Sequence, residues 1–494
     1  MLSQQKKITS SKLFLIAFLA VVMLLSILGR VPAIALPSPK HYTELKFPKL
    51  PKLELPDYTR FELKNGIIVY LMEDHELPLI GGRALFQTGG RFEPENQVGL
   101  ASLTGTVMRT GGTSQHPPEE INQFLEQKAA AVETSIGNTV GSAGFNCLTE
   151  DLTEVFNLFA EVIREPVFVE EKLELAKQQW RGSIARRNDD PDSIVSREFQ
   201  KLIYGKTSPY ARTVEYETLN NISQEDLIDF HAKYFHPENM ILGIVGDFKT
   251  KKMRSLIQEK LGDWEPTSEK VEYSLPDVTQ AEVGNVFFVE QPQLTQSYVQ
   301  VGHLGGELDN PDYVALSVMN NVLNGLGGRL FNNIRSRQGL AYSVSAYWSP
   351  NYDYPGVFVA GGQTRSDATV PFIKSIQEEI ERIRTEPITE EELKNAKDST
   401  INSFIFNFQE PAQTLSRLMR YEYYGYPKDF IFRYRQKLEK VRVADVQRVA
   451  EKYLQPEKIV TLVVGNQEAI EPPLSSLGNG SKITSIDITI PEPS

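Results

Sequence analysis

The stretch DLIDFHAKYFHPENMILGIVG, residues 226–246, has a counterpart 219 residues later in DVQRVAEKYLQPEKIVTLVVG, residues 445–465. The two copies share an initial Asp, a Lys-Tyr pair, a Pro-Glu pair and a final Gly. Each copy predicts an amphipathic helix, a turn at Pro-Glu and a buried apolar strand. Agreement at polar and turn positions is typical of an internal repeat. We therefore predict two halves of like fold, over residues 57–265 and 286–470.

Other segments give the organisation around this repeat. The Asn65-Gly66 step predicts a hairpin turn, and helical periodicity alternates with strands without a strict βαβ pattern. The sequence thus predicts an α+β fold built from two mixed α/β halves. Residues 36–56 are interpreted as a spacer, residues 266–285 as a linker and residues 471–494 as a flexible tail.

The first 35 residues have the pattern of a targeting segment. Three lysines precede an uncharged apolar run from Leu13 to Gly29, and small residues follow at Ala33 and Ala35. This pattern predicts a signal peptide over residues 1–35, with an uncleaved N-terminal anchor as the alternative. We expect the protein to be exported, to the periplasm or the cell exterior, and to be membrane-bound only if the segment is retained.

Composition excludes several classes of function. The chain has 494 residues, a net charge of −12 and a single cysteine, Cys147. An acidic surface disfavours nucleic-acid binding, which needs cationic contacts to phosphate. One cysteine cannot form an internal disulfide framework or a multi-cysteine metal site.

Several local motifs carry a resemblance to a known family. These are Phe86–Arg91 with Gly99-Leu100-Ala101, then residues 205–212, and then Arg329–Arg335 with Gly339–Val344. Together with the repeat, they resemble the pitrilysin/insulinase zinc peptidases (inverzincins), and among these the short bacterial processing proteases. The resemblance implies a clam-like arrangement of two homologous halves of the processing-peptidase type.

In that family, a helix after Gly-Leu-Ala carries H-x-x-E-H, which supplies two zinc ligands and a general base. Here the corresponding positions are Ser102, Gly105 and Thr106, and the position of the third ligand, a Glu, falls at Ser183. Neutral hydroxyls do not replace imidazole and carboxylate as zinc ligands. We predict no metal and no cofactor in this chain, and expect the zinc in a partner subunit.

Arg335 and Tyr342 are the candidate catalytic residues. The resemblance implies that this Arg and Tyr reach the zinc site of another half and stabilise the substrate carbonyl and the oxyanion in trans. A guanidinium and a phenol are suitable donors to developing negative charge.

Two further features concern binding. The stretch around Val132, Glu133 and Thr134 is similar to the family's substrate-binding edge strand, which pairs with extended peptides; an ordinary edge strand is the alternative. The aromatic residues of 421–434 are expected to pack in a core or interface.

The resemblance suggests two functions. In the first, the chain is an exported, non-catalytic subunit of a heterodimeric zinc metalloendopeptidase. It binds unfolded peptides and supplies Arg335 and Tyr342 to a related zinc-bearing subunit. In the second, the chain is an inert scaffold or binding protein of the same fold, like the core subunits of respiratory complexes.

Overall fold

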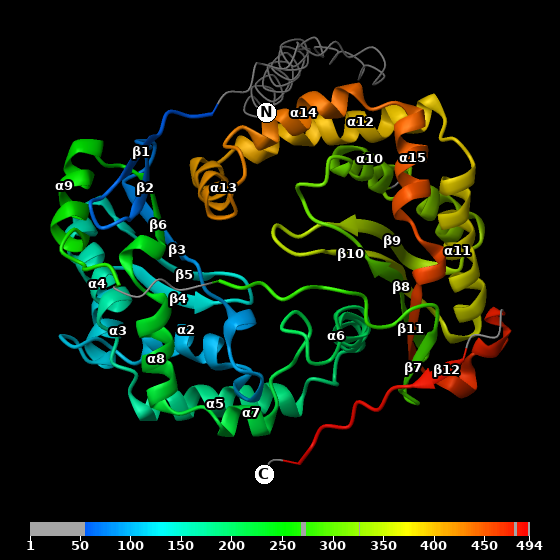
Figure 1. Cartoon of the computed structure of the whole chain (residues 1–494), viewed down its shortest axis with the longest axis horizontal. Coiled ribbons are helices and arrows are strands. Elements are labelled where there is room, and N and C mark those ends of the chain that lie inside the picture. Colours follow the sequence, from blue (N-terminus) through cyan, green and yellow to red (C-terminus); the bar gives the residue numbers. More distant parts are fainter. Residues whose placement is uncertain (1–54, 268–272, 326, 479–481, 493–494) are drawn as a thin grey trace, which may run out of the picture. The chain divides into compact units, whose positions relative to one another are not determined.

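The computed structural model describes residues 55–267, 273–325, 327–478 and 482–492 (Figure 1). The predicted signal peptide and most of the predicted spacer lie outside the described residues. Among the residues that are described, no helix is both long enough and apolar enough to cross a membrane.

The first half is built on a six-stranded sheet in the order β1-β2-β6-β3-β5-β4, in which only the β2–β6 pair is parallel. Its strands are β1 (Thr59–Glu62), β2 (Ile68–Glu73), β3 (Leu79–Phe86), β4 (Ala131–Ile136), β5 (Gly141–Leu148) and β6 (Met240–Gly246). One large apolar core lies between this sheet and its helices. These helices are α2 (Leu100–Thr110), α3 (Pro118–Gln127), α4 (Leu152–Arg164), α5 (Glu170–Ala185), α7 (Tyr216–Asn220), α8 (Gln224–Tyr234) and α9 (Thr250–Leu261).

The second half repeats five strands of this plan in a sheet of order β12-β7-β11-β8-β10-β9, and its sixth strand, β12, is parallel to β7, whereas β1 is antiparallel to β2. Its strands are β7 (Val286–Glu290), β8 (Gln296–Leu304), β9 (Ala341–Ser349), β10 (Val357–Arg365), β11 (Val460–Gly465) and β12 (Ile483–Ser485). The accompanying helices are α10 (Tyr313–Leu323), α11 (Thr369–Thr385), α12 (Glu390–Phe404), α14 (Phe430–Lys440) and α15 (Val443–Tyr453). The repeated strands β6 and β11 occupy equivalent positions, each with a parallel neighbour on one side. This confirms the predicted α+β fold of two like halves.

Two helices are exchanged between the halves (Figure 1). Helix α6 (Pro191–Tyr204) belongs to the first half in sequence, but it packs on β8 and β11 of the second sheet. Helix α13 (Pro411–Tyr423) belongs to the second half, but it packs on β6, β2 and β3 of the first sheet. The two helices start 220 residues apart, which is close to the 219-residue offset of the repeat. Each sheet is therefore covered on one face by a helix from the other half.

Each exchanged helix has its own apolar core. Helix α6 contributes Phe199 and other buried residues to a cluster with Val289 and Leu462. Helix α13 contributes Leu418 and Met419 to a cluster on the first sheet. On that sheet a Cβ at Gly243 would lie 2.2 Å from Met419 Sδ, so a glycine allows α13 to approach β6 closely.

Part of the segment 471–494, which we predict to be a flexible tail, is paired and packed in the structure. Ile483 pairs with Val286, so β12 joins the second sheet. Ile486 and Ile488 pack against the α6 core, and Ile490 packs against the core of the first half. The Ile residues at alternate positions 486, 488 and 490 give this segment the period-two pattern of a half-buried strand. The Pro, Ser and Gly residues around it obscured that signal.

We predict that the exchanged helices make the two halves unfold together. Phe199→Ala and Leu418→Ala each empty an almost fully buried site, so each should lower the free energy of unfolding by about 3 kcal/mol. In calorimetry, each variant should shift one shared transition to lower temperature. Leu175→Ala, at a side chain on α5 that is 49% exposed, is the control and should change stability by no more than about 0.5 kcal/mol. Two separate transitions, only one of which responds to Phe199→Ala, would contradict the coupling.

Candidate functional site

Helix α2 carries three of the four positions of the family's zinc site, Ser102, Gly105 and Thr106, and Ser183 lies on α5. At Gly105 there is no room for a side chain. A Cβ at Gly105 would lie 2.4 Å from the backbone N of Ile136 and 2.9 Å from the carbonyl C of Ser135, both on β4. Thr134 Oγ1 also donates to the Gly105 carbonyl oxygen at 2.6 Å. The backbone of β4 therefore fills the space that a side chain at the base position would need.

Two of the hydroxyl groups at the zinc-site positions, those of Thr106 and Ser183, are bonded within their own helices. Thr106 Oγ1 donates to the Ser102 carbonyl oxygen at 3.0 Å, and Ser183 Oγ donates to the Gln179 carbonyl oxygen at 3.1 Å. Such bonds to the carbonyl four residues earlier satisfy a hydroxyl without any ligand. Among the described residues, no group of three His, Cys, Asp or Glu side chains is placed to hold a metal ion. The residues at these positions do not fit a zinc ion.

The predicted peptide-binding stretch forms β4, which lies at the edge of the first sheet. Val132 is fully buried, Glu133 is exposed and Thr134 is half-buried. Arg109 of α2 donates from Nε to the Val132 carbonyl oxygen at 2.8 Å and from Nη2 to Asn122. One main-chain acceptor of the edge strand is therefore already occupied by a side chain of the same chain. The sequence did not single out Arg109, because nothing local indicates which carbonyl its guanidinium reaches.

Arg335 lies in an unusual helix. Residues Phe331–Arg337 form a π-helix, a rare geometry that is frequent at functional sites. The helix closes through a bond from Leu340 N to the Ile334 carbonyl oxygen, and Gly339 follows with φ +65°. This glycine turns the chain directly into β9, where Tyr342 lies.

Tyr342 sits on a β-bulge. Ser343 pairs with Gln363 and Ala341 pairs with Thr364, which leaves Tyr342 as the extra residue on β9. A bulge re-aims a side chain and is common next to binding sites. The Tyr342 side chain is 79% exposed. The bulge could not be predicted from the sequence, because it depends on the register with β10.

The two candidate residues are neighbours. The Arg335 guanidinium carbon lies 5.1 Å from the centre of the Tyr342 ring and 4.8 Å from that of Phe331. Both side chains are exposed, and among the described residues neither the guanidinium nor the phenol has a hydrogen-bond partner. The structure thus places Arg335 and Tyr342 side by side with their donor groups unused. Whether they act in catalysis stays a prediction.

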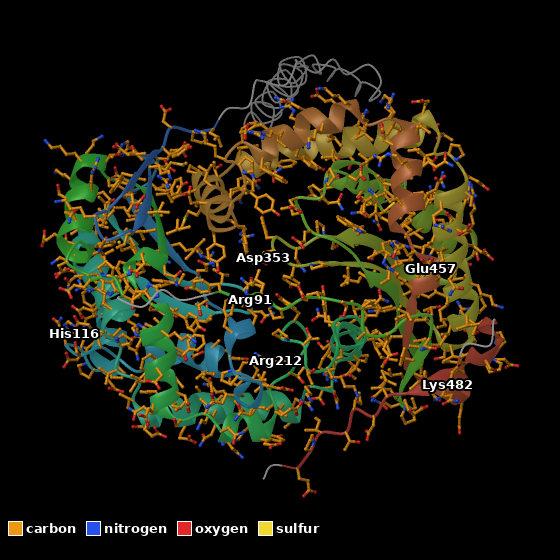
Figure 2. The ribbon with its side chains drawn as sticks, viewed as in Figure 1. Arg91, His116, Arg212, Asp353, Glu457 and Lys482 are labelled. Carbon is orange, nitrogen blue, oxygen red and sulfur yellow. The ribbon has the colours of Figure 1, made fainter. Side chains whose placement is uncertain are left out.

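A buried ion pair joins the two halves (Figure 2). Arg91 Nη1 and Asp353 Oδ2 are 2.8 Å apart, and the Arg91 side chain is only 2% exposed. Tyr210 and Tyr354 stack beside this pair, with ring centres 4.0 Å apart. Sequence reasoning missed this pair, since its members are 262 residues apart.

We predict opposite effects of Gly→Ala at two helical glycines. Gly105→Ala forces a methyl group onto the β4 backbone and should destabilise the protein by about 2 kcal/mol. Gly182→Ala on α5 meets no atom within 4 Å and should stabilise it by about 0.5–1 kcal/mol, because Ala is the better helix former. Urea unfolding of both variants measures the difference. Equal stability of the two variants would show that α2 is not held against β4.

Comparisons with known proteins agree with this geometry. Residues 83–215 match the family model described as insulinase (peptidase family M16), and residues 221–400 match the model described as the peptidase M16 inactive domain. An uncharacterised zinc protease, YmxG, of Bacillus subtilis is 24% identical over 365 residues, which cover 72% of this chain and 86% of that protein. The non-peptidase homologue YmxG of Helicobacter pylori is 23% identical over 401 residues, which cover 80% of this chain and 91% of that one.

A solved structure shows the same fold. The peptidase M16 inactive domain from Pseudomonas fluorescens superposes with a TM-score of 0.75 at 25% identity, over 84% of this chain and all of that one. The match to an inactive-domain model and the likeness to a non-peptidase homologue are consistent with a non-catalytic protein. With both domain models matched in succession and the fold shared, the chain belongs to peptidase family M16.

Proposed function

We propose that the chain is the non-catalytic, substrate-binding subunit of a heterodimeric zinc endopeptidase. A related subunit supplies the zinc ion and the general base, and this chain supplies Arg335 and Tyr342. The observation that carries the proposal is the exposed Arg335–Tyr342 pair, held on a π-helix and a β-bulge.

The chemistry of the pair supports this role. A guanidinium offers several N–H donors and a phenol offers one O–H donor, and both suit an oxygen that gains negative charge. Packing of the guanidinium over the ring favours this arrangement of the two groups before any ligand arrives. Pre-positioned donors stabilise a transition state without reorganisation at the moment of reaction.

Peptide binding by β4 and export of the protein are further parts of the proposal. The edge position of β4 supports pairing with an extended peptide, such as an unfolded substrate. The basic and apolar pattern of residues 1–35 supports export to the periplasm or the cell exterior, as a cleaved or a membrane-anchored protein.

One observation favours a second candidate, an inert scaffold of the same fold. Arg109 occupies the Val132 carbonyl oxygen, so a peptide that pairs along the whole of β4 would have to displace a buried guanidinium. A scaffold would need neither an accessible β4 nor the Arg335–Tyr342 pair.

We predict that the pair affects turnover and not assembly. The protein is co-purified with the related zinc-bearing subunit from the same source, and cleavage of an unfolded peptide is followed. Arg335→Ala and Tyr342→Phe should each lower kcat by about 100-fold, as expected for loss of an oxyanion donor. The mass of the complex should stay unchanged.

Two neighbouring residues provide matched controls. Arg337→Ala removes an exposed guanidinium of the same π-helix that is bonded to Asn333, and Tyr347→Phe removes the hydroxyl of an exposed tyrosine on the same strand. Both should leave kcat within about twofold. Equal kcat in all four variants, or the absence of any complex with a zinc-bearing subunit, would favour the scaffold.

A further inference from the structure

A cavity of about 510 Å³ in the second half is walled by aromatic side chains. It lies between the start of α10, the loop of residues 307–311, the connection from α13 to α14, and α14 itself. Six rings line it: Tyr313, Tyr352, Tyr424, Tyr426, Phe430 and Tyr434. Cavities of this size are typical of sites for small molecules.

Contacts among these rings fix the walls. Tyr352 stacks on Tyr424 with ring centres 4.6 Å apart and an angle of 11°, and Tyr426 meets Phe430 edge-on at 5.2 Å. The hydroxyls of three of these tyrosines are taken up by neighbours: Tyr424 bonds Thr139 Oγ1, Tyr426 bonds the Tyr352 carbonyl, and Tyr434 bonds Ser317. What these residues still offer to a ligand is mainly their π-electron faces, except at Tyr352, where the Arg420 guanidinium already lies 5.8 Å from the ring centre.

The cavity also holds carboxylates whose charge is incompletely compensated. Glu307 is half-buried and, among the described residues, has no hydrogen-bond or ion-pair partner. Asp353 uses Oδ2 for Arg91, whereas its Oδ1 is buried without a partner. Burial raises the pKa of Glu307, and the charges of Asp309 and Asp353 raise it further. The cationic lining residues Arg433 and Lys437 are exposed, and Arg433 is paired with Asp429 at 2.8 Å.

We propose that this cavity binds an organic cation, a primary ammonium or guanidinium group on an alkyl chain. The aromatic faces attract the charge and cover the alkyl chain. Glu307, which has no partner among the described residues, accepts the N–H donors, and the carboxylates of Asp309 and Asp353 in the lining add negative charge. The cavity lies outside the degenerate zinc positions and does not contain Arg335 or Tyr342, so the proposal is independent of the proposed peptidase role.

The test is calorimetric titration of the purified protein with two amines. Cadaverine represents a free amine, and Nα-acetyl-lysine methylamide represents the side chain of a peptide. Nα-acetyl-norleucine methylamide is the uncharged match to the latter. We expect saturable binding of at least one amine and about tenfold weaker binding of the norleucine compound. Saturation by cadaverine alone identifies a free amine as the ligand, and saturation by the lysine compound alone identifies a side chain.

Two variants locate the binding. Glu307→Gln keeps the shape of the side chain and removes its charge, and should weaken amine binding about tenfold. Phe430→Leu removes a lining ring that no cationic side chain approaches among the described residues, and should weaken amine binding about fivefold. Glu457→Gln makes the same charge change at an exposed glutamate that Figure 2 labels away from Asp353, and should leave affinity within about twofold.

Three results would overturn the proposal. In the first, binding of neither amine reaches saturation at amine concentrations up to about 10 mM. In the second, the norleucine compound binds as tightly as the lysine compound, which would mean an apolar pocket. In the third, the Glu307→Gln and Glu457→Gln variants lose the same amount of affinity for the amines, which would mean general attraction of cations to an acidic protein.

Discussion

The exchange of α6 and α13 is the constraint on which the rest of the structure depends. A sheet face with apolar side chains must be covered, and here each half uses a helix from the other half for that purpose. Neither half therefore has a complete set of packing surfaces alone. The same exchange holds the halves in register, because it brings Tyr423 and Tyr424 to Thr139 and accompanies the buried Arg91–Asp353 pair. The C-terminal Ile residues add a third connection, since they touch α6 and the first core in succession.

The repeat could be predicted from sequence because its signals are local. Helical periodicity, the Pro-Glu turn and the apolar strand all lie within 21 residues of each other in each copy. The exchange could not be predicted in the same way. An amphipathic helix such as α6 indicates that one face is buried, but not which sheet buries it. The Asp189-Asp190-Pro191 run only marks its start, where Asp190 caps the helix by accepting from Ser193 N.

The features of the candidate site also fall into two groups, those that the sequence indicates locally and those that depend on tertiary structure. Residue identity alone indicates that Ser102, Gly105, Thr106 and Ser183 cannot form the family's zinc site. Tertiary geometry was needed to find that β4 presses on Gly105, that Arg109 reaches Val132 and that Tyr342 sits on a bulge. Each of these depends on how one element is registered against another, and no short window of sequence contains that information. The cavity beside Asp353 is of the same kind: the aromatic residues of 421–434 predicted packing, but not a space between them.

The degenerate zinc-site positions and the Arg335–Tyr342 pair lie in different surroundings in the structure. At the zinc-site positions, Gly105 lies against β4, and the hydroxyls of Thr106 and Ser183 donate to carbonyl oxygens within their own helices. At Arg335 and Tyr342 the opposite holds, since both side chains are exposed and their donors lack partners among the described residues. A π-helix and a bulge both interrupt regular hydrogen bonding and are no more stable than the regular elements they replace. These two irregular elements hold two exposed donor side chains side by side, an arrangement that the subunit hypothesis needs and the scaffold hypothesis does not.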